Sequence, residues 1–295
     1  MVVKVQRKGI PKQYLYNIAG GVFLLATVFL GVRFSVMSAS VPGCVDRYAR
    51  TTSLSFARGP SSPLPKPEFV AQLSGGEWGF QQHGNLVVDA NVPGGTAMTV
   101  SLPSGAKKGG TPRTPGSGLG FDWNPRVLGD ATSGCLSYEV FLPRDWSYNA
   151  SGILPGLYGG PKGFSSTSNV PGTFEARVGW SFGPRLGVNI YRGGEGGKAR
   201  VGTQPARYHV PQGRWVQIMQ EIKLNDPGQA NGLLRLWVDG EIRIDIPSVR
   251  YYAGKQQPRI LGVVGDTHYG DPRSAWRSAP KPSAIKLSPF KLYWN

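Results

Sequence analysis

The sequence predicts an all-β fold, an antiparallel β-sandwich of the jelly-roll type, and three observations support it. The chain has 42 Gly and 25 Pro among 295 residues, and glycine and proline at this density would interrupt every long helix. It also has 8 Trp, 12 Tyr and 12 Phe, which a disordered chain lacks. Finally, apolar residues alternate with period 2 in short runs of about 5–9 residues bounded by turn residues, as in strands.

The chain begins with a basic segment followed by an apolar one. Residues 1–13 carry four Lys or Arg and no acid, and residues 14–32 are apolar apart from Asn17 and Thr27. Nineteen such residues can cross a bilayer, and the basic flank predicts a cytoplasmic N-terminus. We therefore expect a basic cytoplasmic tail and, over residues 14–37, a transmembrane signal-anchor or a signal peptide.

Both interpretations of this segment place the rest of the chain outside the cytoplasm. An uncleaved anchor would hold the domain at the inner or plasma membrane. Cleavage near the small residues 38–40 would release it as a periplasmic or secreted protein. In an oxidising compartment Cys44 and Cys135 could pair, although the sequence does not give their separation.

The exported part is basic and divides into a linker and a domain. Five of the 33 Lys and Arg precede residue 41, so 28 remain against 17 Asp and Glu, a net charge of +11. Residues 38–67 are rich in Pro and Ser and are expected to form a linker. We expect the jelly-roll domain over residues 68–295, with a surface insertion at 103–118 where Gly, Pro and Lys show no apolar period.

Strands are expected where apolar alternation is bounded by turn residues. The clearest hairpin pairs Leu233–Val238 with Glu241–Ile246 through the two-residue turn Asp239-Gly240. The remaining expected strands are Asn85–Val92, Cys135–Leu142, Gly172–Phe182, Leu186–Arg192, Arg214–Leu224, Ile260–Val264 and Pro289–Tyr293.

Two neighbouring strands suggest a polar sheet face. In 174–180 the odd positions Glu175 and Arg177 face away from the apolar even positions, and in the next strand Asn189 and Tyr191 face away from Val188 and Ile190. If the strands pair, these four polar side chains share one face. The face is either solvated or the floor of a sugar-binding groove, because aromatic rings stack on sugars and the Arg fork suits a carboxylate.

Two further strings stand out. Ile153–Gly160 (ILPGLYGG) is expected to be a tight loop between strands, either a structural turn or part of a site. Residues 264–271 end a strand and contain His268, which is either structural or a catalytic base, since the unperturbed pKa of histidine lies near neutrality.

Together these strings resemble polysaccharide lyase family 14 and its jelly-roll relatives, the alginate and glucuronan lyases. The resemblance is carried by residues 154–160, 174–191, 213–240 and 264–270, and it spans about residues 68–295. It implies a jelly roll with a substrate groove on its concave sheet.

The resemblance transfers the functional residues of the family only in part. Arg177 matches the Arg of the family's Ser-x-Arg pair, and Tyr191 matches the second Tyr of its Tyr-x-Tyr pair. Glu175 stands at the Ser position, Asn189 at the first Tyr position, and Ile153 where the family has its catalytic Lys.

These features predict an exported or anchored lyase that cleaves a uronic acid-containing polysaccharide by β-elimination. Such a reaction needs a group that neutralises the carboxylate, a base and an acid. We expect Arg177, helped by Asn189, to bind the carboxylate, and Tyr191 to be the acid. His268 is the leading candidate for the base, a role that Tyr191 could also fill. Residues that could line subsites are Glu175, Tyr158, Lys162, Trp180 and Tyr269.

The alternative is a non-catalytic carbohydrate-binding or envelope protein of the same fold. A glycoside hydrolase would need two opposed carboxylates, and only Glu175 is plausibly placed. The sequence indicates no cofactor and no metal ligands, and metal dependence cannot be read from it, since no carboxylate cluster has ligand spacing. The expected partners are an acidic polysaccharide and, through the N-terminal segment, the membrane; no nucleic-acid-binding motif is present.

Overall fold

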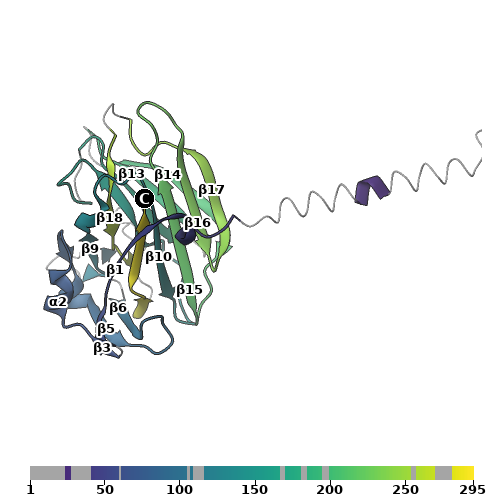
Figure 1. Ribbon diagram of the computed structural model, residues 1–295. Helices are drawn as coiled ribbons and strands as arrows, with labels where there is room; N and C mark the ends of the chain where they lie inside the picture. Colours follow the sequence, from purple (N-terminus) through teal and green to yellow (C-terminus); the bar gives the residue numbers. More distant parts are fainter. Residues whose placement is uncertain are drawn as a thin grey trace, which may run out of the picture. The chain divides into compact units, whose positions relative to one another are not determined.

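The computed structural model shows a β-sandwich whose two antiparallel sheets enclose one apolar core (Figure 1). Residues 42–295 form one compact unit. The structure describes residues 24–27, 41–59, 61–104, 107–108, 116–166, 170–180, 185–194, 199–253, 257–269 and 281–295. The all-β sandwich expected from the sequence is confirmed.

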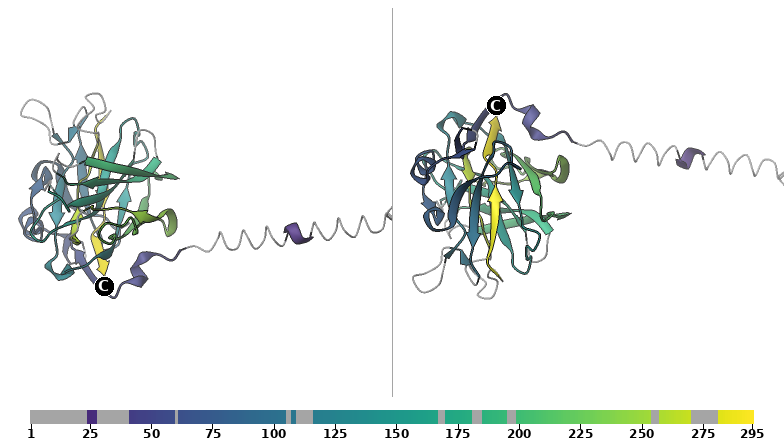
Figure 2. Two further views of the ribbon diagram at one scale, coloured as in Figure 1. Left: turned by 90° about the horizontal axis from the view of Figure 1, so that it is seen from above. Right: turned by 90° about the horizontal axis from the view of Figure 1, so that it is seen from below.

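The nine-stranded sheet has the order β17-β16-β15-β10-β20-β6-β5, with β21 pairing with both β10 and β1. In the right-hand view of Figure 2 the yellow C-terminal strands run between strands from earlier parts of the chain. Its strands are β1 (Arg50–Leu54), β5 (Gly84–Val88), β6 (Thr96–Leu102), β10 (Ser133–Phe141), β15 (Trp215–Lys223), β16 (Gly232–Val238), β17 (Glu241–Val249), β20 (Ser283–Leu287) and β21 (Phe290–Trp294).

The eight-stranded sheet has the order β14-β13-β12-β11-β18-β9-β4, with β19 pairing with β11. Its strands are β4 (Glu77–Trp78), β9 (Gly120–Trp123), β11 (Gly152–Gly160), β12 (Phe174–Trp180), β13 (Arg185–Arg192), β14 (Ala199–His209), β18 (Arg259–Val264) and β19 (His268–Tyr269). The short remaining elements are η1 (Cys44–Arg47), β2 (Ala57–Gly59), β3 (Ser62–Pro63), α2 (Lys66–Ala71), α3 (Phe80–His83), β7 (Lys107–Lys108), β8 (Gly116–Ser117) and η2 (Arg126–Leu128).

Each of the nine expected strands corresponds to an observed one, because burial of alternate side chains specifies these segments strongly. The hairpin β16–β17 turns at Asp239 and Gly240, whose φ angles are 51° and 78°. Positive φ at both turn residues matches the right-handed twist of the strands. Of the expected insertion 103–118, the structure describes residues 103–104, 107–108 and 116–118.

The prediction that Ile153–Gly160 forms a loop is wrong, since these residues lie in β11, between β12 and β18. The glycines allow close approach to neighbouring strands: a Cβ at Gly156 would lie 2.0 Å from the carbonyl oxygen of Ala176. Glycine in a strand interior often marks such an approach or a bulge.

A register shift between Ile153 and Gly156 interrupts the pairing of β11 with β12. A buried side chain from the opposite sheet supplies hydrogen bonds there. Gln220 accepts a hydrogen bond from the backbone N–H of Leu157 at 2.9 Å and donates one to the carbonyl oxygen of Ala176 at 2.8 Å. Because buried backbone groups are costly to leave unpaired, Gln220 helps to fix β11 against β12.

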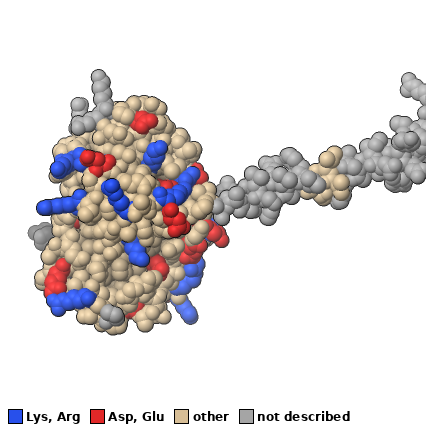
Figure 3. All heavy atoms as spheres, in the orientation of Figure 1, with Lys and Arg blue, Asp and Glu red and all other residues tan. Residues whose placement is uncertain are grey.

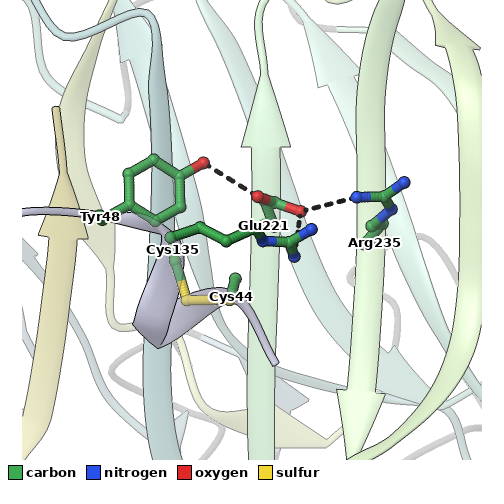
Figure 4. Close-up of a disulfide and its surroundings, with 6 residues drawn as sticks. Cys44, Tyr48, Cys135, Glu221 and Arg235 are labelled. Carbon is green, nitrogen blue, oxygen red and sulfur yellow. Dashed lines mark hydrogen bonds and ion pairs between the residues drawn. A yellow bond between two sulfur atoms is a disulfide. The ribbon is translucent and has the colours of Figure 1, made fainter. Parts of the chain in front are cut away.

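The prediction of a linker over residues 38–67 is also wrong for the part that the structure describes. Residues 50–54 form β1, which pairs with β21, and residues from Pro42 onward belong to the domain. The segment 44–48 lies over the outer face of the nine-stranded sheet, where Cys44 is bonded to Cys135 on β10 (Figure 4). The sequence had left this disulfide open.

Side chains of the nine-stranded sheet hold the same segment in place, and Figure 4 shows two of them, Glu221 and Arg235. Glu221 on β15 accepts hydrogen bonds from Arg47 at 2.9 Å and from Tyr48 at 3.1 Å, and Arg235 lies 3.6 Å from the same carboxylate. The Arg47 guanidinium also lies 5.2 Å from the ring centre of Trp237.

The expected membrane or signal segment, 14–37, lies outside the described residues except for a helical turn at 24–27. Within the described part of the chain, no helix combines the length and the apolar character that crossing a bilayer requires.

Candidate functional site

Charged and aromatic side chains gather on the outer face of the eight-stranded sheet, the face turned away from the core. On β12 and β13 the even-numbered residues 174–180 and 186–190 belong to the core. The odd-numbered residues therefore point outward. Glu175 lies opposite Tyr191, and Arg177 opposite Asn189. The polar face expected from the alternation is confirmed.

Arg177 is the centre of this face. One guanidinium nitrogen pairs with Asp266 and the other with Glu175. The side chains of Glu175 and Asp266 are 0% and 5% exposed, and that of Arg177 is 14% exposed. Burial acts to lower the pKa of Arg177, but the charges of Asp266 and Glu175 outweigh it and raise that pKa. One cation thus pairs with both carboxylates.

Asp266 follows strand β18 and reaches the site through a second contact. Its Oδ1 accepts a hydrogen bond from the indole N–H of Trp78 at 3.0 Å. A Cβ at Gly120 would lie 2.0 Å from that oxygen and 2.1 Å from the indole nitrogen. Glycine on β9 therefore leaves the room in which this hydrogen bond forms.

A third buried carboxylate, Asp122 on β9, completes what we call the Arg177 cluster: Arg177, Glu175, Asp266 and Asp122. Asp122 accepts a hydrogen bond from the backbone N–H of Ser166 at 2.8 Å. Burial raises the pKa of Asp122, and the charges of Asp266 and Glu175 add to that rise against the hydrogen bonds from Ser166. The cluster holds three carboxyl groups and one guanidinium.

Tyr191 and Asn189 border the cluster on β13, and both are partly exposed. The Arg177 guanidinium lies 5.4 Å from the centre of the Tyr191 ring, within the range of cation–π attraction. On this side of the sheet, Tyr191 and Asn189 are therefore closer to solvent than Arg177 is.

Tyr158 shares this face but is covered. It is 1% exposed and packs with Leu261, Val264 and Phe164. Burial, with the nearby charge of Asp122 as the second cause, raises the pKa of Tyr158. The predicted role of Tyr158 in a subsite therefore does not fit its position in this structure.

Ile153 and His268 are direct neighbours across β11 and β19. Ile153 lies opposite Gly179 of β12 and is partly exposed on the outer face. His268 is 2% exposed, its ring centre is 6.2 Å from that of Trp78, and its Nδ1 is 3.2 Å from the carbonyl oxygen of Tyr269. An aliphatic side chain thus occupies the position where the resemblance puts a lysine.

Two of the predicted subsite residues belong to the core, and assigning them to the site was wrong. Trp180 donates a hydrogen bond from its indole to the carbonyl oxygen of Ala150 at 2.8 Å. Tyr269 stacks on Trp146, with ring centres 4.5 Å apart. Both face away from Arg177, because their registers place them on the inner side of the sheet. Lys162 is exposed in the turn after β11.

The structure adds three residues that the sequence reasoning missed: Asp122, Asp266 and Trp78. Asp266 lies within the string 264–271 that was singled out for its histidine, and Asp122 alternates with the core residues Phe121 and Trp123. Within the described residues, no group of three or more His, Cys, Asp or Glu side chains is arranged to hold a metal ion.

The outer face of the nine-stranded sheet has a different arrangement of charges from the Arg177 cluster. On the surface drawn in Figure 3, Lys and Arg are scattered, some beside Asp or Glu and others apart from them. The net charge of +16 on the whole chain is therefore not gathered into one cationic patch on that face.

Comparison with known proteins identifies the family. The sequence profile of polysaccharide lyase 14 matches residues 90–185 and 199–285, which include most strands of both sheets. The chain belongs to the polysaccharide lyase 14 family. A search of curated protein sequences finds no match.

Solved structures share the fold at low sequence identity. A PL-14 alginate lyase from Aplysia kurodai has a TM-score of 0.67 and 16% identity, over 84% of this chain and 100% of that one. The alginate lyase vAL-1 from Chlorella virus has a TM-score of 0.56 and 16% identity, over 72% and 89%. An endo-β-1,4-glucuronan lyase from the fungus Trichoderma reesei has a TM-score of 0.53 and 14% identity, over 84% and 96%.

Proposed function

We propose that the protein binds a uronic acid-containing polysaccharide on the outer face of the eight-stranded sheet and cleaves it by β-elimination. The observation that carries the proposal is that Arg177, Asn189 and Tyr191 converge on one face of a polysaccharide lyase 14 fold. Names of the structural relatives, alginate lyase and glucuronan lyase, support a uronic acid as the sugar.

The reaction balances without a cofactor or water. A base removes the proton beside the uronic carboxyl group, and the electron pair of that C–H bond forms the new carbon–carbon double bond. The bond from the neighbouring ring carbon to the glycosidic oxygen breaks, and an acid protonates that oxygen. The products are a saturated end and an unsaturated end.

Tyr191 suits the role of the acid because its phenol is partly exposed and borders Arg177. His268 is our candidate for the base. Its Nδ1 faces the carbonyl oxygen of Tyr269, and because a carbonyl can only accept, the neutral ring carries its proton on Nδ1 and has Nε2 as the proton acceptor. Trp78 packs near the buried ring, so substrate reaches His268 only after a local displacement.

We also propose that the domain works outside the cytoplasm. Support comes from the basic and apolar segments before residue 33 and from the Cys44–Cys135 disulfide, which belongs to an oxidising compartment. Alkaline extraction of membranes tests the anchor: an uncleaved anchor stays with the lipid, and a cleaved chain is released.

A second candidate function is carbohydrate binding without catalysis. It is favoured by Ile153, whose side chain can neither accept nor donate a proton at the position where the resemblance expects lysine. The buried Arg177 cluster would then only shape the binding face.

The ultraviolet absorbance of unsaturated uronic ends tests the proposal. The full chain is incubated with alginate, glucuronan and other acidic glycans, while reducing ends are counted in parallel. We expect absorbance to rise on one glycan and to fall at least about 100-fold for Tyr191→Phe, which removes a general acid.

Tyr293→Phe is the matched control, because Tyr293 lies on the nine-stranded sheet and should keep full activity. Full activity in Tyr191→Phe contradicts the assignment of Tyr191. New reducing ends without absorbance indicate a hydrolase. No product, with retention of the protein on an immobilised polyuronate, favours the binding function.

A further inference from the structure

The Arg177 cluster carries the opposite charge from what a free uronate requires. A polyanion site needs a cation whose donors can turn toward the ligand. Here both terminal nitrogens of Arg177 are engaged, one by Glu175 and one by Asp266, and Asp122 adds a third carboxyl group. Among the described members of the cluster, acids outnumber the base.

The Arg177 guanidinium has five N–H donors, so a substrate carboxylate that reached it would either share the group with Glu175 and Asp266 or displace one of them. Glu175 and Asp266 are almost fully buried, and breaking a buried pair leaves an uncompensated charge, which is strongly unfavourable. Placing a further carboxylate beside those of the cluster would add repulsion between like charges. The geometry therefore opposes a free carboxylate at this position.

We propose that the uronic acid unit cleaved by this protein is esterified, so that its carboxyl group is neutral when it reaches the Arg177 cluster. The inference rests on the proposed lyase function and specifies its substrate class. An ester needs no counter-ion, and the proton beside an ester carbonyl is more acidic than the proton beside a carboxylate. The ester group itself removes the negative charge that a protein cation would otherwise have to neutralise.

The residues at the surface of this face agree with a neutral carbonyl. Asn189, opposite Arg177 and partly exposed, offers amide N–H donors without net charge. Such a donor suits an ester carbonyl oxygen, which becomes negative as the proton leaves. In the β-elimination written above, the ester group stays intact, the proton goes to the base, and the glycosidic oxygen takes a proton from the acid.

The net positive charge of residues 41–295 is compatible with this substrate. The proposal concerns only the unit at the reacting position, and the other units of a partly esterified chain keep their charge. A domain with net charge +11 still attracts such a chain through its long-range field.

The experiment compares one polyuronate in two forms, the free acid and the highly methyl-esterified polymer of the same length. The full chain is assayed at neutral pH by absorbance, against blanks without protein because esters also eliminate slowly in base. We expect the ester to be cleaved faster by at least about tenfold, since like-charge placement costs several kcal/mol.

Two variants test whether the Arg177 cluster sets this preference. Glu175→Gln and Asp266→Asn keep the shape of the side chain and remove one negative charge beside Arg177. We expect each to shift the ratio of free-acid to ester cleavage at least about tenfold toward the free acid. Asp239→Asn is the matched control, because it removes an acid that pairs with Arg214 at an exposed site; its ratio should not change.

The outcomes separate this inference from the proposed function. Cleavage of the free acid at a rate equal to or above that of the ester overturns the ester preference while the lyase function stands. An unchanged ratio in both folded variants also overturns it. If neither form is cleaved, the lyase function itself fails, and the inference fails with it. If one variant does not fold, the other variant and the wild-type ratio still decide.

Discussion

The outer faces of the two sheets carry ion clusters that differ in charge balance and in burial. On the nine-stranded sheet one carboxylate, Glu221, lies between two guanidinium groups, Arg47 and Arg235 (Figure 4). On the eight-stranded sheet one guanidinium, Arg177, lies between two carboxylates. Arg235 also pairs with Asp245 at 2.9 Å, so the first cluster is balanced in charge, whereas the second has a surplus of negative charge.

The two clusters also differ in their access to water. The side chains of Arg47 and Arg235 are 32% and 22% exposed, so their charges are hydrated. Glu175 and Asp266 are 0% and 5% exposed, so theirs are not. A buried surplus of charge is costly, and selection retains such a cost most readily at a functional site. By this contrast, the ion pairs of Glu221 have a structural role, whereas the Arg177 cluster is a candidate active site.

The largest effect is expected from removing the central residue of the buried cluster. Arg177→Met leaves two desolvated carboxylates without their cation, and breaking a buried pair in this way costs about 3–5 kcal/mol. Urea unfolding at neutral pH measures the loss. Acid neutralises the carboxylates, so the deficit should shrink as the pH falls.

Arg177→Lys is the control for this substitution, since it keeps one positive charge and should recover part of the stability. A loss below about 1 kcal/mol in Arg177→Met would mean that Glu175 and Asp266 are hydrated, as the cations of the other cluster are.

A smaller effect is expected from the corresponding change on the other sheet. Glu221→Gln keeps an acceptor for Tyr48, and its two cations can turn into water. We expect a loss of about 1 kcal/mol, typical of a weakened hydrogen bond. The same urea assay measures it, and a loss as large as that of Arg177→Met would remove the distinction between the two faces.

The smallest effect is expected from Asp122→Asn, and it is a gain. The pKa of Asp122 is raised in the folded protein by burial first, so the folded state favours the protonated form. That contribution is complete below the ordinary pKa of an aspartate and is lost as the pH rises through the raised value. At neutral pH the ionised carboxylate therefore costs stability.

Asparagine keeps an acceptor for the N–H of Ser166 and removes this cost. The variant should be more stable than the wild type at neutral pH by less than about 1 kcal/mol, with no difference in strong acid. Thermal unfolding at both pH values tests this, and a variant that is less stable at neutral pH would contradict the assigned cause.

Much of the fold could be predicted from the sequence because alternate side chains of each strand are buried, so apolar residues recur there with period 2. The prediction failed for β11 (Gly152–Gly160), whose glycines and proline resemble a turn. Glycine is required there because Ala176 and other neighbours approach the backbone of β11 closely. This approach depends on strands that are distant in the sequence. The linker prediction failed likewise, because β1 is stabilised by pairing with β21 at the other end of the chain.

The candidate site was predictable only where residues share neighbouring strands. Glu175, Arg177, Asn189 and Tyr191 followed from the alternation of β12 and β13. Asp266 reaches Arg177 from 89 positions further along the chain, and no local pattern encodes such a contact. Trp180 and Tyr269 were assigned by residue type, whereas their parity along the strand places them in the core.

The disulfide has a mechanical consequence. A force that pulls on the chain before Cys44 passes through the sulfur bridge to Cys135 on β10, which pairs with β15, β20 and β21. It bypasses β1, which pairs with β21 and could otherwise be peeled from the sheet edge one residue at a time. Tension applied on the N-terminal side of the domain would therefore reach an interior strand through covalent bonds before any hydrogen bond of β1 is stretched.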